Sequence, residues 1–156
     1  MKAVNLFLLA VMIGIELILG IVVAPVIFYP QNFIGDGILS HYQSGILMTQ
    51  IFIKMGYLLL IVSIINILFE IFSYFREKFN FKIKFSKLIL SLIILILSLV
   101  FVFYFTEQII SMQKLGEQAT TSAEFTDIHS ASEITLKIIL ASQIFLYFLS
   151  FKIEKK

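Results

Sequence analysis

The sequence predicts an all-α membrane protein in which four transmembrane helices form an up-down antiparallel bundle. Of its 156 residues, 60% are hydrophobic and only 14% are charged, which is far from the composition of soluble domains. Four long apolar runs each supply enough length to cross a hydrocarbon core about 30 Å thick. Lysine and arginine gather beside alternate ends of these runs, as they do when successive helices run up and down through a bilayer.

Four helices are expected within one membrane domain that spans residues 1–156. The first apolar run is too long for a secretory signal peptide, and no small-residue cleavage pattern ends it. The expected ranges are about 4–28, 46–75, 88–105 and 122–151, with the third helix extending outside the bilayer to about 118 in an alternative reading.

Local signals mark two of the expected helix ends. Pro25 removes a backbone donor and disfavours helical geometry at Ala24, so a kink or a helix end is expected there. Residues Thr121-Ser122-Ala123-Glu124 have the spacing of a capping box. The fourth helix is therefore expected to begin well outside the bilayer.

The distribution of positive charge predicts the orientation. Short loops rich in lysine and arginine stay in the cytoplasm, and the connections 29–44 and 106–132 contain Lys114 as their one basic residue. Both termini are therefore expected on the cytoplasmic side of a bacterial inner membrane, and segment 76–87 is expected as a cytoplasmic surface segment whose lysines snorkel. The residues on the cytoplasmic side are Lys2, Arg76, Lys78, Lys82, Lys84, Lys87, Lys152, Lys155 and Lys156.

Composition and missing motifs exclude several classes of function. A formal charge of +2 is too small to indicate a nucleic-acid partner. The chain has no cysteine, which excludes disulfides, thiolate metal sites and cysteine nucleophiles. The signatures GxSxG and HExxH and a phosphate-binding loop are also absent. We therefore expect a protein that is not an enzyme.

Glu16 is the most informative single position, because an ionisable side chain at membrane depth is costly. Helical spacing places it on one stripe with Gly20, where a neighbouring helix can approach closely, so the stripe should face the bundle interior. Glu16 must find a partner or be protonated. One interpretation is a structural hydrogen bond or an ion pair with Lys54, and the other is a carboxylate that binds a proton or a ligand.

The second helix carries a polar face in its cytoplasmic half, formed by Gly56, Ser63, Asn66, Glu70 and Ser73 at helical intervals. Such a face either packs inward through hydrogen bonds between helices or lines a wet cavity. Lys54 lies on a different face, where snorkelling toward the headgroups is its alternative role.

Both histidines, His41 and His129, fall in segments expected on the outer side. An up-down bundle brings its outer connections together, so these side chains and the region of Pro25 are expected to form any site the protein has. In the alternative, the histidines are solvated and Pro25 only ends a helix. Histidine and thioether ligands suit copper, but methionine is also an ordinary gap-filler in apolar cores, so no cofactor is the first expectation, and haem or copper is the alternative. The metal-ligand candidates are His41, Met48, Met55, Met112 and His129.

Two segments carry a resemblance to a known family: Gly20-Ile21-Val22-Val23-Ala24-Pro25-Val26-Ile27-Phe28 and Phe125-Thr126-Asp127-Ile128-His129-Ser130-Ala131-Ser132. They resemble the small four-helix membrane family of unknown function related to transmembrane protein 205, although the tryptophans usual in that family are absent here. More remotely, the chain is similar to membrane proteins of the copper-resistance D type. The resemblance implies a four-helix fold and no established catalytic residue.

The leading hypothesis is a non-enzymatic inner-membrane protein, a small binding or accessory helical bundle, because four helices leave little room for a private aqueous path. Its expected partners are the lipid bilayer and either another membrane protein or a second copy of the chain. One alternative is a transporter or permeation subunit that acts as an oligomer and uses Glu16 with the Gly56 to Ser73 face. The other alternative is a haem, quinone or copper-binding membrane protein that uses the two histidines.

Overall fold

The computed structural model describes residues 2–35, 37–76 and 80–152, and these form helices and turns without a β-strand. Within this part of the chain, four helical stretches are long and apolar enough to cross a membrane, as the sequence predicts. Lys78, Lys155 and Lys156, which contribute to the predicted orientation, lie outside the described residues. The four spans are Lys2–Phe28, His41–Arg76, Phe81–Lys114 and Ala123–Phe151.

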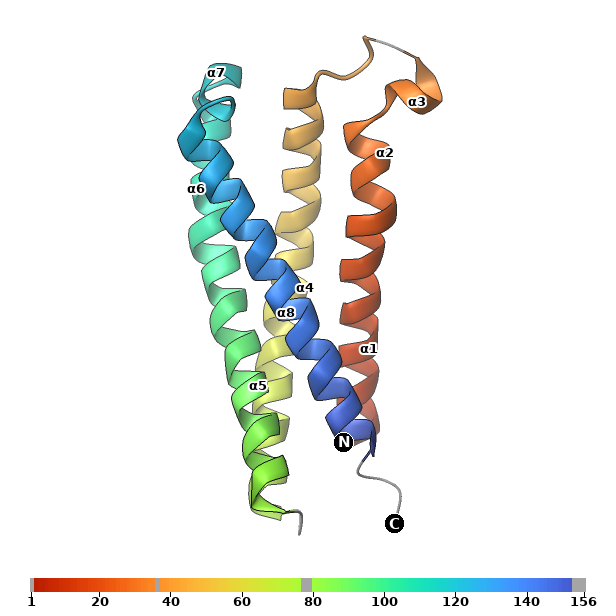
Figure 1. Ribbon diagram of the computed structural model, residues 1–156, viewed down its shortest axis with the longest axis vertical. Coiled ribbons are helices and arrows are strands. Elements are labelled where there is room, and N and C mark those ends of the chain that lie inside the picture. Colours follow the sequence, from red (N-terminus) through yellow and green to blue (C-terminus); the bar gives the residue numbers. More distant parts are fainter. Residues whose placement is uncertain (1, 36, 77–79, 153–156) are drawn as a thin grey trace.

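The spans form an up-down bundle. The first span begins and the fourth span ends at one end, which we call the terminal end, and the short helices α3 (Gln31–Ile34) and α7 (Glu117–Thr120) lie at the other, which we call the distal end (Figure 1). Helices α1 and α5 each pack against both α4 and α8. Helix α8 runs obliquely, so that its first turns lie beside α6 and its last turns lie near α1 (Figure 1). These helices are α1 (Lys2–Ile18), α4 (His41–Arg76), α5 (Phe81–Val100), α6 (Thr106–Lys114) and α8 (Ala123–Lys152).

The first span continues through Pro25 instead of ending there. A π-helical segment, η1 (Leu19–Val23), precedes the proline, and the N–H of Ala24 donates to the carbonyl of Leu19. Proline has a bulky ring and lacks a backbone N–H. The wider π-helical turn accommodates it, so the helix resumes as α2 (Ala24–Phe28). A short helix, α3 (Gln31–Ile34), follows.

The second span begins at His41, five residues before the expected start at Ile46. Ser40 and Gln43 form a capping box: the Gln43 N–H donates to Ser40 Oγ at 3.2 Å, and the Ser40 N–H donates to Gln43 Oε1 at 2.9 Å. At 36 residues, α4 is about 54 Å long and extends beyond the hydrocarbon layer. His41 therefore lies on the first turn of a helix.

The third span begins at Phe81 rather than near Leu88, because Asn80 caps it by accepting a hydrogen bond from the Lys82 N–H at 3.1 Å. The basic segment expected at the surface is thus largely the first two turns of α5. Beyond α5 the span passes through a second π-helical segment, η2 (Phe101–Phe105), into α6.

A tight connection joins the third and fourth spans. Gly116, whose φ of 102° favours glycine, precedes the short helix α7 (Glu117–Thr120). The cap of α8 is Ser122, whose Oγ accepts from the Phe125 N–H at 3.1 Å, whereas the Thr121 hydroxyl donates to the Gln118 carbonyl. The capping residue is therefore one position later than the sequence spacing indicates.

Five buried apolar side chains close the middle of the bundle. We call them the central apolar layer. On α1, two of its members lie between Asn5 and Glu16, so the layer separates a polar region at the terminal end from one at the distal end. The members, each at most 5% exposed, are Leu9, Met12, Leu59, Val62 and Leu146.

The outward faces are apolar, with exposed side chains such as Phe7, Ile21 and Phe145. This distribution suits a chain whose solvent is lipid, because lipid tails are as apolar as these side chains. Exposing the side chains to lipid therefore carries no penalty.

Candidate functional site

A cavity of about 540 Å³ occupies the distal half of the bundle. We call it the distal cavity. It lies where α8 diverges from the first span: α2 packs against α4, while the early turns of α8 lie beside α6 (Figure 1). Apolar side chains make most of its wall, among them Phe28, Met48, Phe52, Met55, Phe101 and Leu140. Polar side chains interrupt the wall at Glu16, His41, Thr49, Gln113, His129 and Lys137.

The structure brings three of the residues singled out by the sequence to the wall of this one cavity: Glu16, His41 and His129. Pro25 is exposed and does not line the cavity, although its neighbours Ala24 and Phe28 do. Met48 and Met55 also line it.

Each histidine packs against an aromatic ring. The ring of His41 lies 5.3 Å from that of Phe28 on α2, and the ring of His129 stacks 5.9 Å from that of Phe125. His129 Nε2 also lies 3.3 Å from a carboxylate oxygen of Glu133, which in turn pairs with Lys137. Among the described residues, no group of three or more histidine, cysteine or acidic side chains could hold a metal ion.

Glu16 lines the cavity at membrane depth and meets Gln143 of α8, which does not itself line the cavity. The Gln143 side-chain N–H donates to Glu16 Oε1 at 2.9 Å. The remaining oxygens of the pair, Glu16 Oε2 and Gln143 Oε1, are buried without a hydrogen-bond partner among the described residues. Lys54 is exposed on another face of α4, so the anticipated ion pair with Glu16 is not formed.

Gln143 was not expected from the sequence. Its signal was available, because it is the one amide side chain in the apolar run 134–151. Sequence spacing alone does not reveal which face of α1 such an amide meets.

Two hydrogen bonds between α4 and α6 hold one wall of the distal cavity in place. The Tyr42 hydroxyl donates to the carbonyl of Gln113 at 2.6 Å, and the Gln113 side chain donates to Thr49 Oγ1 at 2.9 Å. Because these hydrogen bonds join two different spans, they fix this side of the cavity, and the opposite side is formed by η1, α2 and α8.

The polar face of α4 serves packing at the terminal end. Glu70 Oε2 and Lys87 Nζ form a buried ion pair at 2.9 Å, with side chains 2% and 3% exposed respectively. Asn66 donates to Asn5 of α1 at 3.2 Å. Neither Asn66 nor Glu70 lines the distal cavity, from which the central apolar layer separates them. Lys87 is thus a structural partner rather than a snorkelling surface residue.

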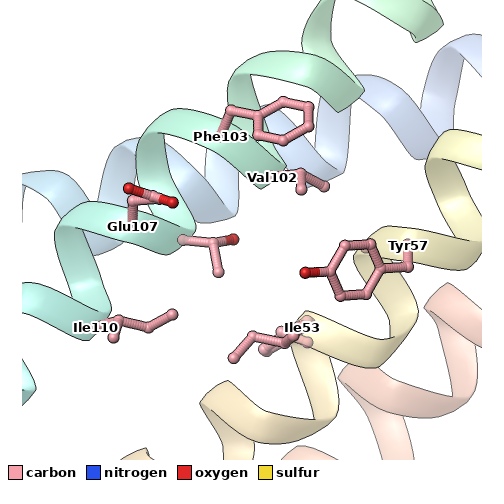
Figure 2. A pocket seen from close by; sticks show the side chains of 9 residues that line it. Ile53, Tyr57, Val102, Phe103, Glu107 and Ile110 are labelled. Atoms are coloured by element: carbon pink, nitrogen blue, oxygen red, sulfur yellow. The ribbon is translucent and has the colours of Figure 1, made fainter.

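A smaller cavity of about 200 Å³ lies between α4 and the η2–α6 segment, with Tyr57 and Glu107 on opposite sides (Figure 2). On the wall of this cavity the two helices approach closely at Gly56, where an added Cβ would lie 2.9 Å from Val102 Cγ2. Gly56 therefore takes part in the close contact between the two helices.

These features define a multi-pass α-helical membrane protein with a ligand-sized cavity at one end of its bundle. The family model described as "Domain of unknown function (DUF4149)" matches residues 7–118, and the chain belongs to that family. The matched part includes Glu16 and His41 and ends before α8, which supplies Gln143 and His129. No curated protein and no solved structure matches the chain.

Proposed function

We propose that this protein is a non-enzymatic membrane protein that binds a small amphipathic molecule in the distal cavity. The observation that carries the proposal is the cavity itself, whose volume of about 540 Å³ is within the usual range of small-molecule sites. Its wall is mainly apolar, with Glu16 at membrane depth and His41 and His129 on α4 and α8 toward the distal end. An occupant with an apolar body and a polar group suits such a wall.

Binding fits the structure better than permeation does. The central apolar layer lies on the terminal side of Glu16, and its members are almost completely buried. A permeation pathway would have to open this layer. A binding site needs only the cavity on its distal side.

The bias in positive charge supports an orientation in which the terminal end faces the cytoplasm of a bacterial inner membrane. In that orientation the distal cavity lies in the outer half of the bilayer, and lipid is the first partner of the chain. We also propose a relationship to the family of transmembrane protein 205, which rests on the two segments quoted above, and a more remote one to copper-resistance D proteins, which rests on the arrangement of the helices. Copper or haem is less favoured as the occupant, because each imidazole packs on an aromatic ring and no group of three or more histidine, cysteine or acidic side chains that could hold a metal ion is present among the described residues.

A cavity-filling variant tests the proposal. Gly20 lines the cavity and an added Cβ would meet nothing within 4 Å, so Gly20→Phe should fill space without disturbing helix packing. Gly14→Phe is the matched control, because Gly14 is equally uncrowded on the same span and does not line the cavity.

The probe is a dodecyl compound that carries a photoactivatable diazirine, applied to the protein in nanodiscs and mapped by mass spectrometry. We expect labelling at cavity residues in the wild type and in Gly14→Phe, and a loss of about tenfold in Gly20→Phe, which would correspond to about 1.4 kcal/mol. Labelling spread over the lipid-facing surface, or labelling that Gly20→Phe does not change, would refute the proposal.

A further inference from the structure

We infer that the molecule held in the distal cavity is a lipophilic amine whose ammonium group binds between Glu16 and Gln143. The inference rests on the proposed function and adds the chemical class of the ligand. Its basis is a mismatch in hydrogen bonding at the deep end of the cavity, together with the aromatic character of the wall.

The Glu16–Gln143 pair presents acceptors that lack donors. The amide N–H of Gln143 already donates to Glu16 Oε1, and Glu16 Oε2 and Gln143 Oε1 are left buried with no partner among the residues that the structure describes. Gln143 is 1% exposed, so bulk water does not reach it. A buried acceptor loses its hydrogen bonds to water and needs another donor in their place, so a matching ligand must bring N–H or O–H groups.

The described cations do not neutralise Glu16. Lys137 pairs with Glu133 on the outward part of α8, and Lys87 pairs with Glu70 beyond the central apolar layer. Lys54 is exposed on a different face of α4. A cationic ligand would therefore supply the charge that a carboxylate at membrane depth needs.

The wall of the cavity suits the rest of such a molecule. The aromatic side chains there can contact an alkyl body, and their π faces attract an ammonium group within about 6 Å. Leu17 and Ile21 line the cavity and are also exposed on the lipid-facing surface, so an apolar chain can enter from the bilayer. The aromatic lining residues are Phe28, Tyr42, Phe52, Phe101 and Phe125.

Other head groups satisfy this site less well. An alcohol has one O–H for two acceptors, and a fatty acid anion has no donor and is repelled by Glu16. A bare metal cation would find two free oxygens, whereas hard cations take about six or more. A primary ammonium has three N–H donors and one positive charge.

The test compares dodecylamine, dodecanol and dodecanoate as competitors of the diazirine probe in nanodiscs of uncharged lipid. We expect dodecylamine to halve the labelling of the wild type at a concentration at least about tenfold lower than either of the other two. Glu16→Gln should abolish this preference, whereas Glu133→Gln, which removes a carboxylate near the outer part of the cavity, should keep it.

A second variant guards against loss of folding in Glu16→Gln. Gln143→Met retains the volume of the side chain and the Glu16 carboxylate but removes the amide, both its acceptor and the N–H that donates to Glu16 Oε1, so it should reduce the preference for the amine without abolishing it. Thermal unfolding of each variant in detergent checks that the bundle remains intact.

The two proposals fail in different ways. If labelling stays sensitive to Gly20→Phe but the three compounds compete equally, the distal cavity binds amphiphiles and the assignment of an amine is wrong. The assignment is also wrong if both Glu16→Gln and Gln143→Met keep the full preference for dodecylamine. If no compound reduces labelling of the cavity, the proposed function and the amine assignment fall together.

Discussion

The polar side chains within the bundle divide into two residue pairs with different roles. Glu16 and Gln143 lie at the distal cavity and keep unused acceptors, while Glu70 and Lys87 are buried together in an ion pair. Both acidic residues are apparent in the sequence, because a charged residue in an apolar run is costly. Their partners are harder to predict, since pairing depends on how two helices are rotated toward each other.

Lys87 was nonetheless within reach of sequence reasoning. Glu70 and Lys87 stand at nearly equal distances along the chain from the connection at 77–79. Consecutive antiparallel helices that pack against each other bring such positions to the same height along the bundle axis. The rule that lysine marks the cytoplasmic surface instead places Lys87 at the membrane surface.

The role of Glu16 in stability can be measured by two substitutions. Glu16→Gln keeps an oxygen that accepts from Gln143, so we expect its cost in free energy of unfolding to be below about 1 kcal/mol. Glu16→Leu leaves the Gln143 amide without that acceptor and should cost about 1–3 kcal/mol. Unfolding in mixed micelles provides the comparison, and equal costs in the two variants would show that the negative charge itself is required.

The buried ion pair calls for single and double substitutions. Lys87→Met removes one partner of the buried Glu70–Lys87 ion pair and should lower the free energy of unfolding by about 3–5 kcal/mol. Adding Glu70→Met should recover most of that loss, because the two apolar side chains need no compensation. A double variant as unstable as Lys87→Met would contradict a purely structural role for the pair.

At the scale of helices, hydropathy predicts the four spans well, but caps set where they begin. Ser40 and Asn80 start their helices several residues before the apolar runs do. A residue pattern that counts only hydrophobic side chains therefore places the first turns of α4 and α5 in loops. The early start of α4 matters for function, because it puts His41 on a helix that lines the distal cavity.

The close contact between α4 and η2 predicts that a larger residue at Gly56 lowers stability. In Gly56→Ala the new methyl group would meet Val102 Cγ2 at 2.9 Å, and overpacking of this kind costs about 1–3 kcal/mol of unfolding free energy. Gly45→Ala is the control, because its nearest atom would lie 3.8 Å away in ordinary contact. Combining Gly56→Ala with Val102→Ala should restore stability, and a loss that persists in this double variant would argue against the contact.

At the scale of the whole molecule, the up-down arrangement follows from hydropathy and charge, whereas the distal cavity does not. The cavity exists because α8 crosses obliquely and leaves the first span at the distal end (Figure 1). Helix tilt depends on packing between neighbouring side chains, so hydrophobic length alone does not predict it. The sequence therefore predicts that both histidines lie on one side of the membrane, but it does not predict the space between the helices.

The orientation is tested with reporter fusions. Fusions after Phe81 and at Lys156 should report the cytoplasm, while fusions near Gly37 and Glu117 should report the opposite side, because basic residues are retained in the cytoplasm. Reversed signals at all four positions would place the distal cavity on the cytoplasmic side of the membrane.

The central claim, that the distal cavity holds a small amphipathic molecule, is tested most directly by native mass spectrometry of the protein released from its own membrane. We expect a bound molecule of discrete mass on the wild type and on Gly14→Phe, and none on Gly20→Phe. Identical bound masses on all three proteins, or no bound molecule on any of them, would contradict the claim.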